Sequence, residues 1–343
     1  MKSVELGSQG LTVSALGFGC MGMSTTYGPS NDQASRATLA RAVDLGVTLF
    51  DTAETYGPFH NERLVGSALA TVRDRVRIAT KVGFIFDDDG KMVMHDGGRP
   101  AVDCSPEHLR TAVNGSLRRL GVEQIDLLYL HRIDQKVPIE ESVGAMADLV
   151  GAGKVGHIGL SEASTATIRR AHATFPLTAV QSEYSLFERG VERNGVLDAV
   201  QQLGIGFVPY SPLGRGMLTG ALTNLDALDD SDFRRHDPRF QGENLDANLR
   251  LVAAISQVAA AKKVLPSQLA LAWLLDQGHV PIPGTRRIQC LEDNLASADI
   301  ALTDADRAAL EDAAPIGKAA GDRYSAGMLA TLDADSDSAP QQH

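Results

Sequence analysis

The sequence is poor in cysteine and has no apolar run long enough to cross a bilayer. Its 343 residues include three cysteines, Cys20, Cys104 and Cys290, which are widely spaced and form no CxxC pair. An odd number of scattered cysteines indicates reduced thiols and argues against a disulfide scaffold. The first residues also lack the apolar segment of a signal peptide, so we expect a cytoplasmic protein with no membrane association.

Positive charge is also scarce. The formal net charge is -11 at pH 7, which argues against binding to nucleic acid or to an anionic membrane surface. An anionic ligand would therefore require a local cluster of arginines. The histidines and cysteines do not have the spacing of metal ligands, and we expect no metal site.

Apolar, strand-like runs alternate with amphipathic segments of helical period from about residue 16 to residue 294. This alternation predicts a parallel sheet with helical crossovers. Eight runs are interpreted as strands: 15–19, 48–51, 76–81, 125–131, 157–161, 178–183, 206–210 and 280–284. The segments interpreted as helices are 34–45, 62–70, 107–120, 139–152, 165–174, 195–203, 248–263, 266–277 and 303–313.

Eight strand–helix pairs predict a (β/α)8 TIM barrel, forming a single domain over residues 1–330. The competing architecture is an open doubly wound sheet, but no GxGxxG follows the first strand. Residues 4–13 are predicted to form a β-hairpin that plugs one end of the barrel. Three long connections, 84–104, 211–247 and the chain after residue 315, are expected on the C-terminal face, where barrels carry function. The small, acidic residues 331–343 are expected to be a disordered tail.

Four side chains that can share protons come from three consecutive strand ends. Asp51, Lys81 and His131 end the second, third and fourth predicted strands, and Tyr56 follows in the loop after Asp51. Because neighbouring strand ends of a barrel lie side by side, we expect these four side chains to converge. Each residue alone has an ordinary structural interpretation, such as packing, capping or solvation. Their joint occurrence at consecutive strand ends is what predicts a site.

This set of side chains is suited to proton transfer. A free phenol has a pKa near ~10 and is a weak acid at neutral pH. A lysine ammonium beside it favours the phenolate and would bring the pKa toward the working pH. Asp51 would hold Lys81 charged and in place, and His131 would orient the oxygen that Tyr56 protonates. The group could therefore give a proton to a developing alkoxide or remove one from an alcohol.

The sequence closely resembles the aldo-keto reductase superfamily of NADPH-dependent (β/α)8 oxidoreductases. The similarity covers residues ~4–314 and is closest to the branch that includes bacterial, fungal and plant auxin-induced-type reductases. The matching stretches are "LGFGCMGMS", "FDTAETYGP", "NERLVGSAL", "IATKVG", "IDLLYLHR", "GKVGHIGLSEAS", "AVQSEYSL", "VPYSPLGRGMLTG" and "VPIPGTRRIQCLEDNLAS".

The resemblance implies an enzyme that reduces aldehydes or ketones to alcohols by direct hydride transfer from NADPH. Tyr56 would be the general acid, Lys81 and Asp51 would tune it, and His131 would orient the carbonyl. Tyr210 would lie against the nicotinamide, with Ser161 and Gln181 at the carboxamide. The loop Ser211, Pro212, Leu213, Gly214, Arg215 and Gly216 would wrap the pyrophosphate. Gly284, Thr285, Arg286 and Arg287 would open a helix whose N-terminus suits an anion, and Arg286 or Arg287 would meet the 2′-phosphate. Arg215, Arg286 and Arg287 together would supply the local positive field, and Asp293 and Asn294 would hold the adenine.

Two residues depart from the pattern of many family members. Glu162 replaces an asparagine at the carboxamide, although glutamate is common in this branch, and Cys290 stands near the adenine end where Gln or Arg is frequent. The substrate-pocket candidates are Phe84, Phe86, Met92, Met23 and Tyr324, which are equally compatible with loop packing. Neither the identity of the small carbonyl substrate nor the oligomeric state follows from the sequence.

Two other functions remain open. Lys81 near a carboxylate and a tyrosine would also suit a Schiff-base aldolase. The barrel could instead bind NADPH without catalysis and act as a redox sensor. Potassium-channel β-subunits resemble this alternative. The complete proton-transfer set favours an enzyme.

Overall fold

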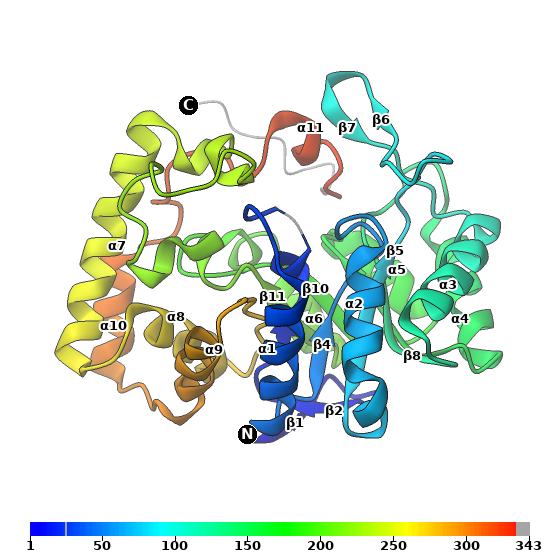
Figure 1. The fold of residues 1–343 in the computed structure, drawn as a ribbon, viewed down its shortest axis with the longest axis horizontal. Helices are drawn as coiled ribbons and strands as arrows, with labels where there is room; N and C mark the ends of the chain where they lie inside the picture. Colours follow the sequence, from blue (N-terminus) through cyan, green and yellow to red (C-terminus); the bar gives the residue numbers. More distant parts are fainter. Residues whose placement is uncertain (25, 334–343) are drawn as a thin grey trace.

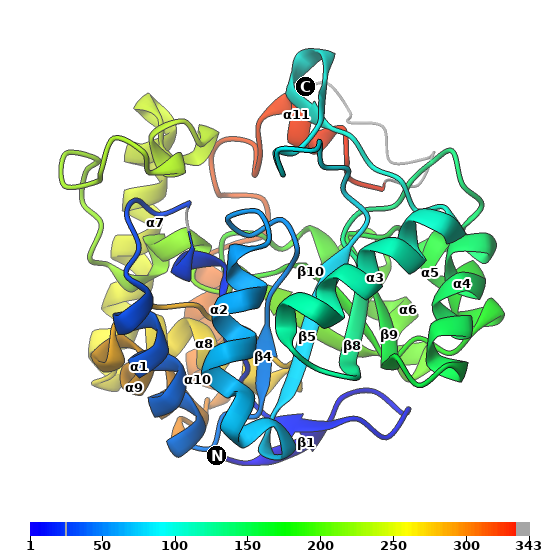
Figure 2. The ribbon, with the colours of Figure 1, turned by 45° about the vertical axis from the view of Figure 1, so that its right-hand side comes forward.

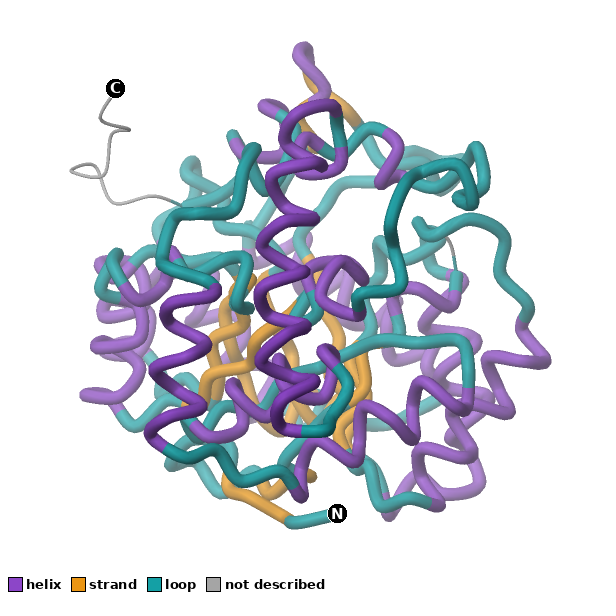
Figure 3. Tube along the Cα trace, turned by 90° about the vertical axis from the view of Figure 1, so that its left-hand side faces the viewer, coloured by secondary structure: helices purple, strands orange, loops and turns teal. Residues whose placement is uncertain are grey.

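The computed structural model describes residues 1–24 and 26–333, which form a barrel of parallel strands surrounded by helices (Figures 1 and 3). Seven strands pair in parallel in the order β11-β10-β9-β8-β5-β4-β3. Their bounds are β3 Phe18–Gly19, β4 Leu49–Asp51, β5 Arg77–Val82, β8 Ile125–Leu130, β9 Val155–Ser161, β10 Ala179–Glu183 and β11 Gly206–Tyr210.

The eighth predicted strand, residues 280–284, closes the barrel between β11 and β3 without forming a regular strand. Pro281 and Pro283 have no N–H to donate, so this segment accepts hydrogen bonds along its junction with β3 but donates none. The four closing bonds are Val280 N–H to Phe207 O (3.2 Å), Ile282 N–H to Pro209 O (3.1 Å), Gly17 N–H to Pro281 O (3.0 Å) and Gly19 N–H to Pro283 O (3.2 Å). The predicted (β/α)8 barrel is therefore confirmed, with an eighth strand that is only partly hydrogen-bonded.

Helices surround the strands, close to the segments that the sequence predicts (Figure 3). They are α1 Asp32–Asp44, α2 His60–Leu69, α3 Pro106–Leu120, α4 Ile139–Gly151, α5 Thr165–Thr174, α6 Val196–Leu203, α7 Gly242–Lys262, α8 Pro266–Asp276, α9 Ile288–Leu295, α10 Asp304–Ala313 and α11 Ala326–Leu329. Within the described ranges no single helix has the length and apolarity to span a membrane. The pair α7 and α8 meets that test only together, across an 85° bend.

The predicted hairpin closes the lower end of the barrel. Strand β1 (Ser3–Glu5) pairs antiparallel with β2 (Thr12–Ser14), and both lie below the strands in Figure 2. Leu6, Leu11 and Val13 are buried in one cluster with the side chains that fill the barrel interior. The hairpin thus covers that interior at the end opposite the long loops.

The three long connections gather at the other end of the barrel. Residues 84–104 carry the hairpin of β6 (Met94–His95) and β7 (Arg99–Pro100), and residues 211–247 carry short 3-10 helices. Figures 1 and 2 show α11 beside the β6–β7 hairpin. A Cβ on Gly327 of α11 would lie 2.6 Å from the carbonyl oxygens of both Gly97 and Gly98, so the contact requires glycine there.

Most of the predicted disordered tail, residues 334–343, lies outside the described residues. The first part of that tail, by contrast, is attached to the barrel. Thr331 is buried, and the Asp333 carboxylate accepts a hydrogen bond from Ser164 N–H (2.9 Å) at the start of α5. The chain after residue 315 therefore returns across the open end of the barrel.

Candidate active site

The structure brings the proton-transfer residues together at one end of the strands. Asp51 ends β4, Lys81 lies in β5 and His131 follows β8, and these three strands are consecutive neighbours in the sheet. The Lys81 ammonium donates hydrogen bonds to the Asp51 carboxylate and to Tyr56 Oη, the latter at 3.1 Å. A third bond runs from Lys81 Nζ to Thr52 O (2.9 Å).

Lys81 is held in its charged form. Its side chain is almost fully buried. Burial lowers its pKa, but the charge of Asp51 and the contact with Tyr56 raise it by more, and the net direction is upward. The second Asp51 oxygen accepts a hydrogen bond from Gln181 Nε2 at 2.8 Å. Gln181 thus fixes the orientation of the carboxylate that holds the lysine.

Tyr56 differs from the sequence-based expectation in the direction of its pKa. Burial raises the pKa of the phenol above its usual value, and the Lys81 ammonium lowers it by a smaller amount. The sequence reveals the lysine but not how deeply the phenol is buried. Tyr56 therefore stays protonated and able to donate, while Lys81 stabilises the phenolate that remains after donation.

His131 is a neutral imidazole beside the phenol. Its ring is nearly perpendicular to that of Tyr56, with centroids 6.0 Å apart, and Phe84 packs against it at 5.0 Å. Burial, then the neighbouring Arg132 cation, hold the pKa of His131 well below its usual value. No described residue is a hydrogen-bond partner for its buried Nδ1. A neutral ring in this position can donate one N–H to an oxygen that lies over Tyr56.

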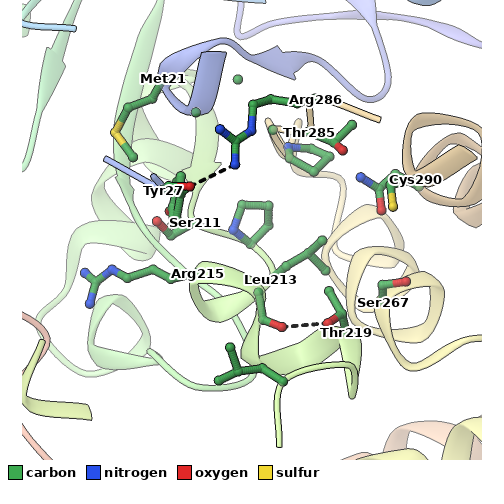
Figure 4. Close-up of a pocket in the computed structure, with 18 of the residues that line it drawn as sticks. Met21, Tyr27, Ser211, Leu213, Arg215, Thr219, Ser267, Thr285, Arg286 and Cys290 are labelled. Carbon is green, nitrogen blue, oxygen red and sulfur yellow. Dashed lines mark hydrogen bonds between the residues drawn. The ribbon is translucent and has the colours of Figure 1, made fainter. Parts of the chain in front are cut away.

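A cavity of about 630 Å³ extends from Asp51 and Tyr56 to helix α9. Figure 4 shows the part of it around Ser211, Arg286 and Cys290. Of the residues predicted to bind cofactor, Ser161 and Gly214 do not line this cavity. The predicted residues that do line it are Gln181, Tyr210, Ser211, Pro212, Leu213, Arg215, Gly216, Gly284, Thr285, Arg286, Arg287, Asp293 and Asn294. The cavity thus follows the path that the sequence assigns to a dinucleotide.

The loop after β11 has an unusual backbone along this cavity. Ser211, Gly214, Arg215 and Gly216 have φ values of +48°, +55°, +57° and +93°. Part of the loop's backbone is used internally, since Gly214 N–H donates to Ser211 O (2.9 Å) and Gly216 N–H donates to Leu213 O (3.0 Å). The left-handed conformation is unfavourable for Ser211 and Arg215 and persists only where the surroundings hold it.

Arg215 holds this loop instead of presenting its charge to a ligand. Its buried guanidinium pairs with Asp237 (2.7 Å) and Glu183 (3.0 Å), and Figure 4 shows it extending away from Arg286. The sequence predicts that Arg215 contributes positive field for the cofactor. This charge prediction is wrong, because two carboxylates neutralise the guanidinium.

The two arginines before α9 have different surroundings. Arg286 donates to the carbonyl oxygens of Tyr27 (2.8 Å) and Pro29 (2.5 Å), which fastens segment 27–29 along the cavity (Figure 4). Arg287 is exposed, and its guanidinium forms no ion pair with any other described residue. Among the described arginines that line the cavity, Arg287 is therefore the one whose guanidinium has no hydrogen-bond or ion-pair partner.

One part of the cavity wall is formed by residues that are not among the predicted site residues. Tyr27 and Arg234 line the cavity, and the guanidinium of Arg234 lies 4.9 Å from the centre of the Tyr27 ring. Phe233 N–H donates to Thr26 O (2.9 Å), which joins the loop after β3 to the loop after β11. The only signal for this wall in the sequence is the length of the 211–247 connection.

The C-terminal segment also reaches the site. Tyr324 Oη is hydrogen-bonded to Tyr210 Oη (2.7 Å). The Glu162 carboxylate accepts bonds from Arg323 and from Glu183 N–H (2.9 Å). The oxygens of Glu162, which replaces the asparagine frequent at this position, thus already bind the C-terminal segment and β10.

The predicted substrate-pocket residues separate into two groups. Phe84 contacts His131, and Tyr324 contacts Tyr210. Phe86 instead pairs with Met92 in a β-bridge, while Met23 is buried in the core. Phe84 and Tyr324 are therefore in contact with residues of the site. No group of three or more His, Cys, Asp or Glu residues in the part of the chain that is described could hold a metal ion.

Comparisons with known proteins agree with this geometry. Residues 15–315 match the model of the aldo/keto reductase family. The chain is 45% identical over 332 residues to a probable aldo-keto reductase of Glycine max, covering 96% of this chain and 93% of that protein. It is 41% identical over 336 residues to a Schizosaccharomyces pombe aldo-keto reductase whose name includes NADP(+), with coverage of 96% and 97%. The solved glycerol dehydrogenase of Gluconobacter oxydans is 28% identical, with a TM-score of 0.79 and coverage of 91% and 94%.

Proposed function

This chain belongs to the aldo/keto reductase family, and we propose that it reduces an aldehyde or ketone to an alcohol with NADPH, using Tyr56 as the general acid. The observation that carries the proposal is the contact of Lys81 Nζ with both Asp51 and Tyr56 at the end of the cavity. That arrangement supplies a proton donor and a stabilised conjugate base where a carbonyl oxygen could lie.

The cavity fits NADPH in shape and in the chemistry of its lining. Loop 211–216 lines the cavity except at Gly214 and would wrap the pyrophosphate. The free guanidinium of Arg287 suits the 2′-phosphate. Tyr210 would lie at the nicotinamide end, and Asp293 and Asn294 at the adenine end. When bound, NADPH supplies the hydride.

The chain's own residues would then position the substrate and move the proton. His131, neutral because it is buried, would donate to the carbonyl oxygen and hold it over Tyr56. Tyr56 Oη would give its proton to that oxygen as the negative charge develops. Lys81 would stabilise the resulting phenolate, while Asp51 and Gln181 keep the ammonium in place.

The same contacts argue against a Schiff-base aldolase. Imine formation needs a neutral amine, but Lys81 donates three hydrogen bonds and its pKa is raised. A lysine in this setting serves as a fixed cation and not as a nucleophile.

The decisive experiment measures NADPH oxidation with a panel of aromatic and aliphatic aldehydes, alongside Tyr56→Phe. We expect the variant to bind NADPH with unchanged affinity in a fluorescence titration and to lose turnover by about 100-fold or more. Full turnover in Tyr56→Phe would contradict the assignment of the acid. NADPH binding by the native protein without turnover on any carbonyl would favour the redox-sensor alternative.

A further inference from the structure

A buried glutamate lies in the loop that carries Tyr56. Glu54 is 2% exposed and stands between Asp51 and Tyr56 in the chain. Its Oε1 accepts a hydrogen bond from Gly83 N–H (3.0 Å), and its own N–H donates to Lys81 O (3.3 Å). The loop is thus attached to the end of β5 through both the side chain and the main chain of one residue.

The end of β5 is also where the other proton-transfer residues are held. Lys81 contacts Tyr56 with its side chain, and Val82 O accepts the N–H of His131 (2.9 Å). At Gly83 the backbone turns out of the sheet with φ of +122°. Its N–H is therefore satisfied by the Glu54 carboxylate and not by a neighbouring strand. The last two residues of β5 and the following Gly83 consequently fix the positions of the Lys81 side chain, His131 and the Tyr56 loop.

Glu54 belongs to a buried cluster in which one cation faces two carboxylates. Arg119 Nε lies 2.5 Å from Glu62 Oε2, and Arg119 Nη2 lies 3.8 Å from Glu54 Oε2. Glu62 is fully buried and also accepts a hydrogen bond from Thr80 Oγ1 (2.7 Å). With both glutamates ionised, the cluster would carry one uncompensated negative charge.

Burial, together with this excess of negative charge, makes Glu54 a weaker acid than an ordinary glutamate. Burial and then the charge of Glu62 raise the pKa of Glu54 to about 8, against the lowering effects of Gly83 N–H, Arg119 and Phe84 N–H. Burial raises the pKa of the neighbouring Cys104 thiol to about 12, and the charge of Glu54 adds a smaller contribution in the same direction. In both protonation states, an oxygen of Glu54 can still accept from Gly83 N–H. Ionisation strengthens that bond, because hydrogen bonds to a charged acceptor are the stronger ones.

We propose that Glu54 is a positioning residue for the reduction, which fastens the Tyr56 loop to the end of β5 and so sets the contact between Tyr56 and Lys81. This inference rests on the proposed function, since it assigns a role around the same acid. Glu54 touches neither substrate nor cofactor. It acts through Gly83 and the loop backbone, and its ionisation adds a step to the pH dependence of kcat near pH 8.

The test compares Glu54→Ala, Glu54→Gln and Glu62→Gln with the native enzyme, using NADPH and para-nitrobenzaldehyde over a range of pH. Glu54→Ala removes the acceptor, and we expect kcat to fall about tenfold or more while the dissociation constant of NADPH stays unchanged. Glu54→Gln keeps an acceptor oxygen without the charge. It should retain kcat within about twofold and lose the step near pH 8.

Glu62→Gln is the matched control, because it removes one charge from the same guanidinium without touching Gly83. We expect near-native kcat and a step displaced to lower pH, since Glu54 then has Arg119 to itself. Native kcat in Glu54→Ala, or an unchanged step in Glu54→Gln, overturns the proposal. Should Glu54→Ala fail to fold, the pH profile of Glu54→Gln decides. Loss of turnover in Tyr56→Phe with native behaviour of both Glu54 variants would reject this inference alone and leave the proposed function standing.

Discussion

Arg323 and Glu162 form a bidentate ion pair, with distances of 3.0 Å from Nη1 to Oε1 and 2.6 Å from Nη2 to Oε2. The pair joins the C-terminal segment to the end of β9, at a residue whose φ is +55°. The Glu162 side chain is 5% exposed and that of Arg323 is 19% exposed. Removing one partner of such a buried ion pair is strongly destabilising, because the other charge stays buried without compensation. The pair is thus a main attachment of the C-terminal segment over the site.

Arg323→Ala should destabilise the protein and loosen the C-terminal segment. Removing one partner of a buried pair costs about 3 kcal/mol, here at the lower end of the usual range because Arg323 is partly solvated. We also expect KM for carbonyl substrates to rise, because Tyr324 would no longer be held against Tyr210. Urea denaturation and steady-state kinetics measure the two effects. Arg323→Lys keeps the charge but loses the bidentate geometry. Its stability and its KM should lie between those of the native protein and Arg323→Ala.

The two arginines before α9 should have separable effects on cofactor binding. Arg287→Ala should weaken NADPH binding about 10-fold or more and leave NADH binding nearly unchanged, because we propose that its guanidinium meets only the additional phosphate of NADPH. Arg286→Ala should weaken both cofactors alike, since it releases segment 27–29. Fluorescence titrations with both nucleotides provide the comparison. The reverse pattern would reassign the phosphate contact to Arg286.

Glu54 should also make stability depend on pH. Its pKa is raised from 4.5 to about 8 on folding, so the folded state binds the proton more tightly than the unfolded chain. The associated stability is complete below pH 4.5 and is lost as pH rises toward 8. The melting temperature of the native protein should therefore fall relative to that of Glu54→Gln between about pH 5 and about pH 9. A constant difference across that interval would show that the carboxyl does not titrate in this way.

The sequence predicts the barrel and the convergence of Asp51, Tyr56, Lys81 and His131, because both depend on where the strands end. Strand ends are marked by the change from apolar to polar residues, and adjacent strand ends must meet in a barrel. The helix that starts after Ser105 is likewise predicted by its cap, its first proline and Gly121, which has the left-handed φ of +67°.

The charges of the cofactor site are harder to predict, because their partners are distant in the chain. Arg215 and Arg286 both line the cavity and are both predicted to give it positive charge. In the structure, Arg215 is neutralised by Asp237 and Glu183, whereas Arg286 binds carbonyl groups of segment 27–29. The C-terminal segment has no periodic pattern that would indicate docking. Its attachment depends on single pairs such as Arg323 with Glu162, which only the folded chain brings together.

The two prolines of segment 280–284 give the barrel wall a seam. Along its junction with β3 the segment accepts hydrogen bonds and donates none, so this junction has about half the bonds of a regular parallel pair. Ile282, Pro283 and Gly284 of the same segment line the cavity. Thermal opening should therefore begin along this line, with the amides of Gly17 and Gly19 exchanging their hydrogens with solvent ahead of those in β5 and β8. A nucleotide filling the cavity would bridge the seam and slow that exchange.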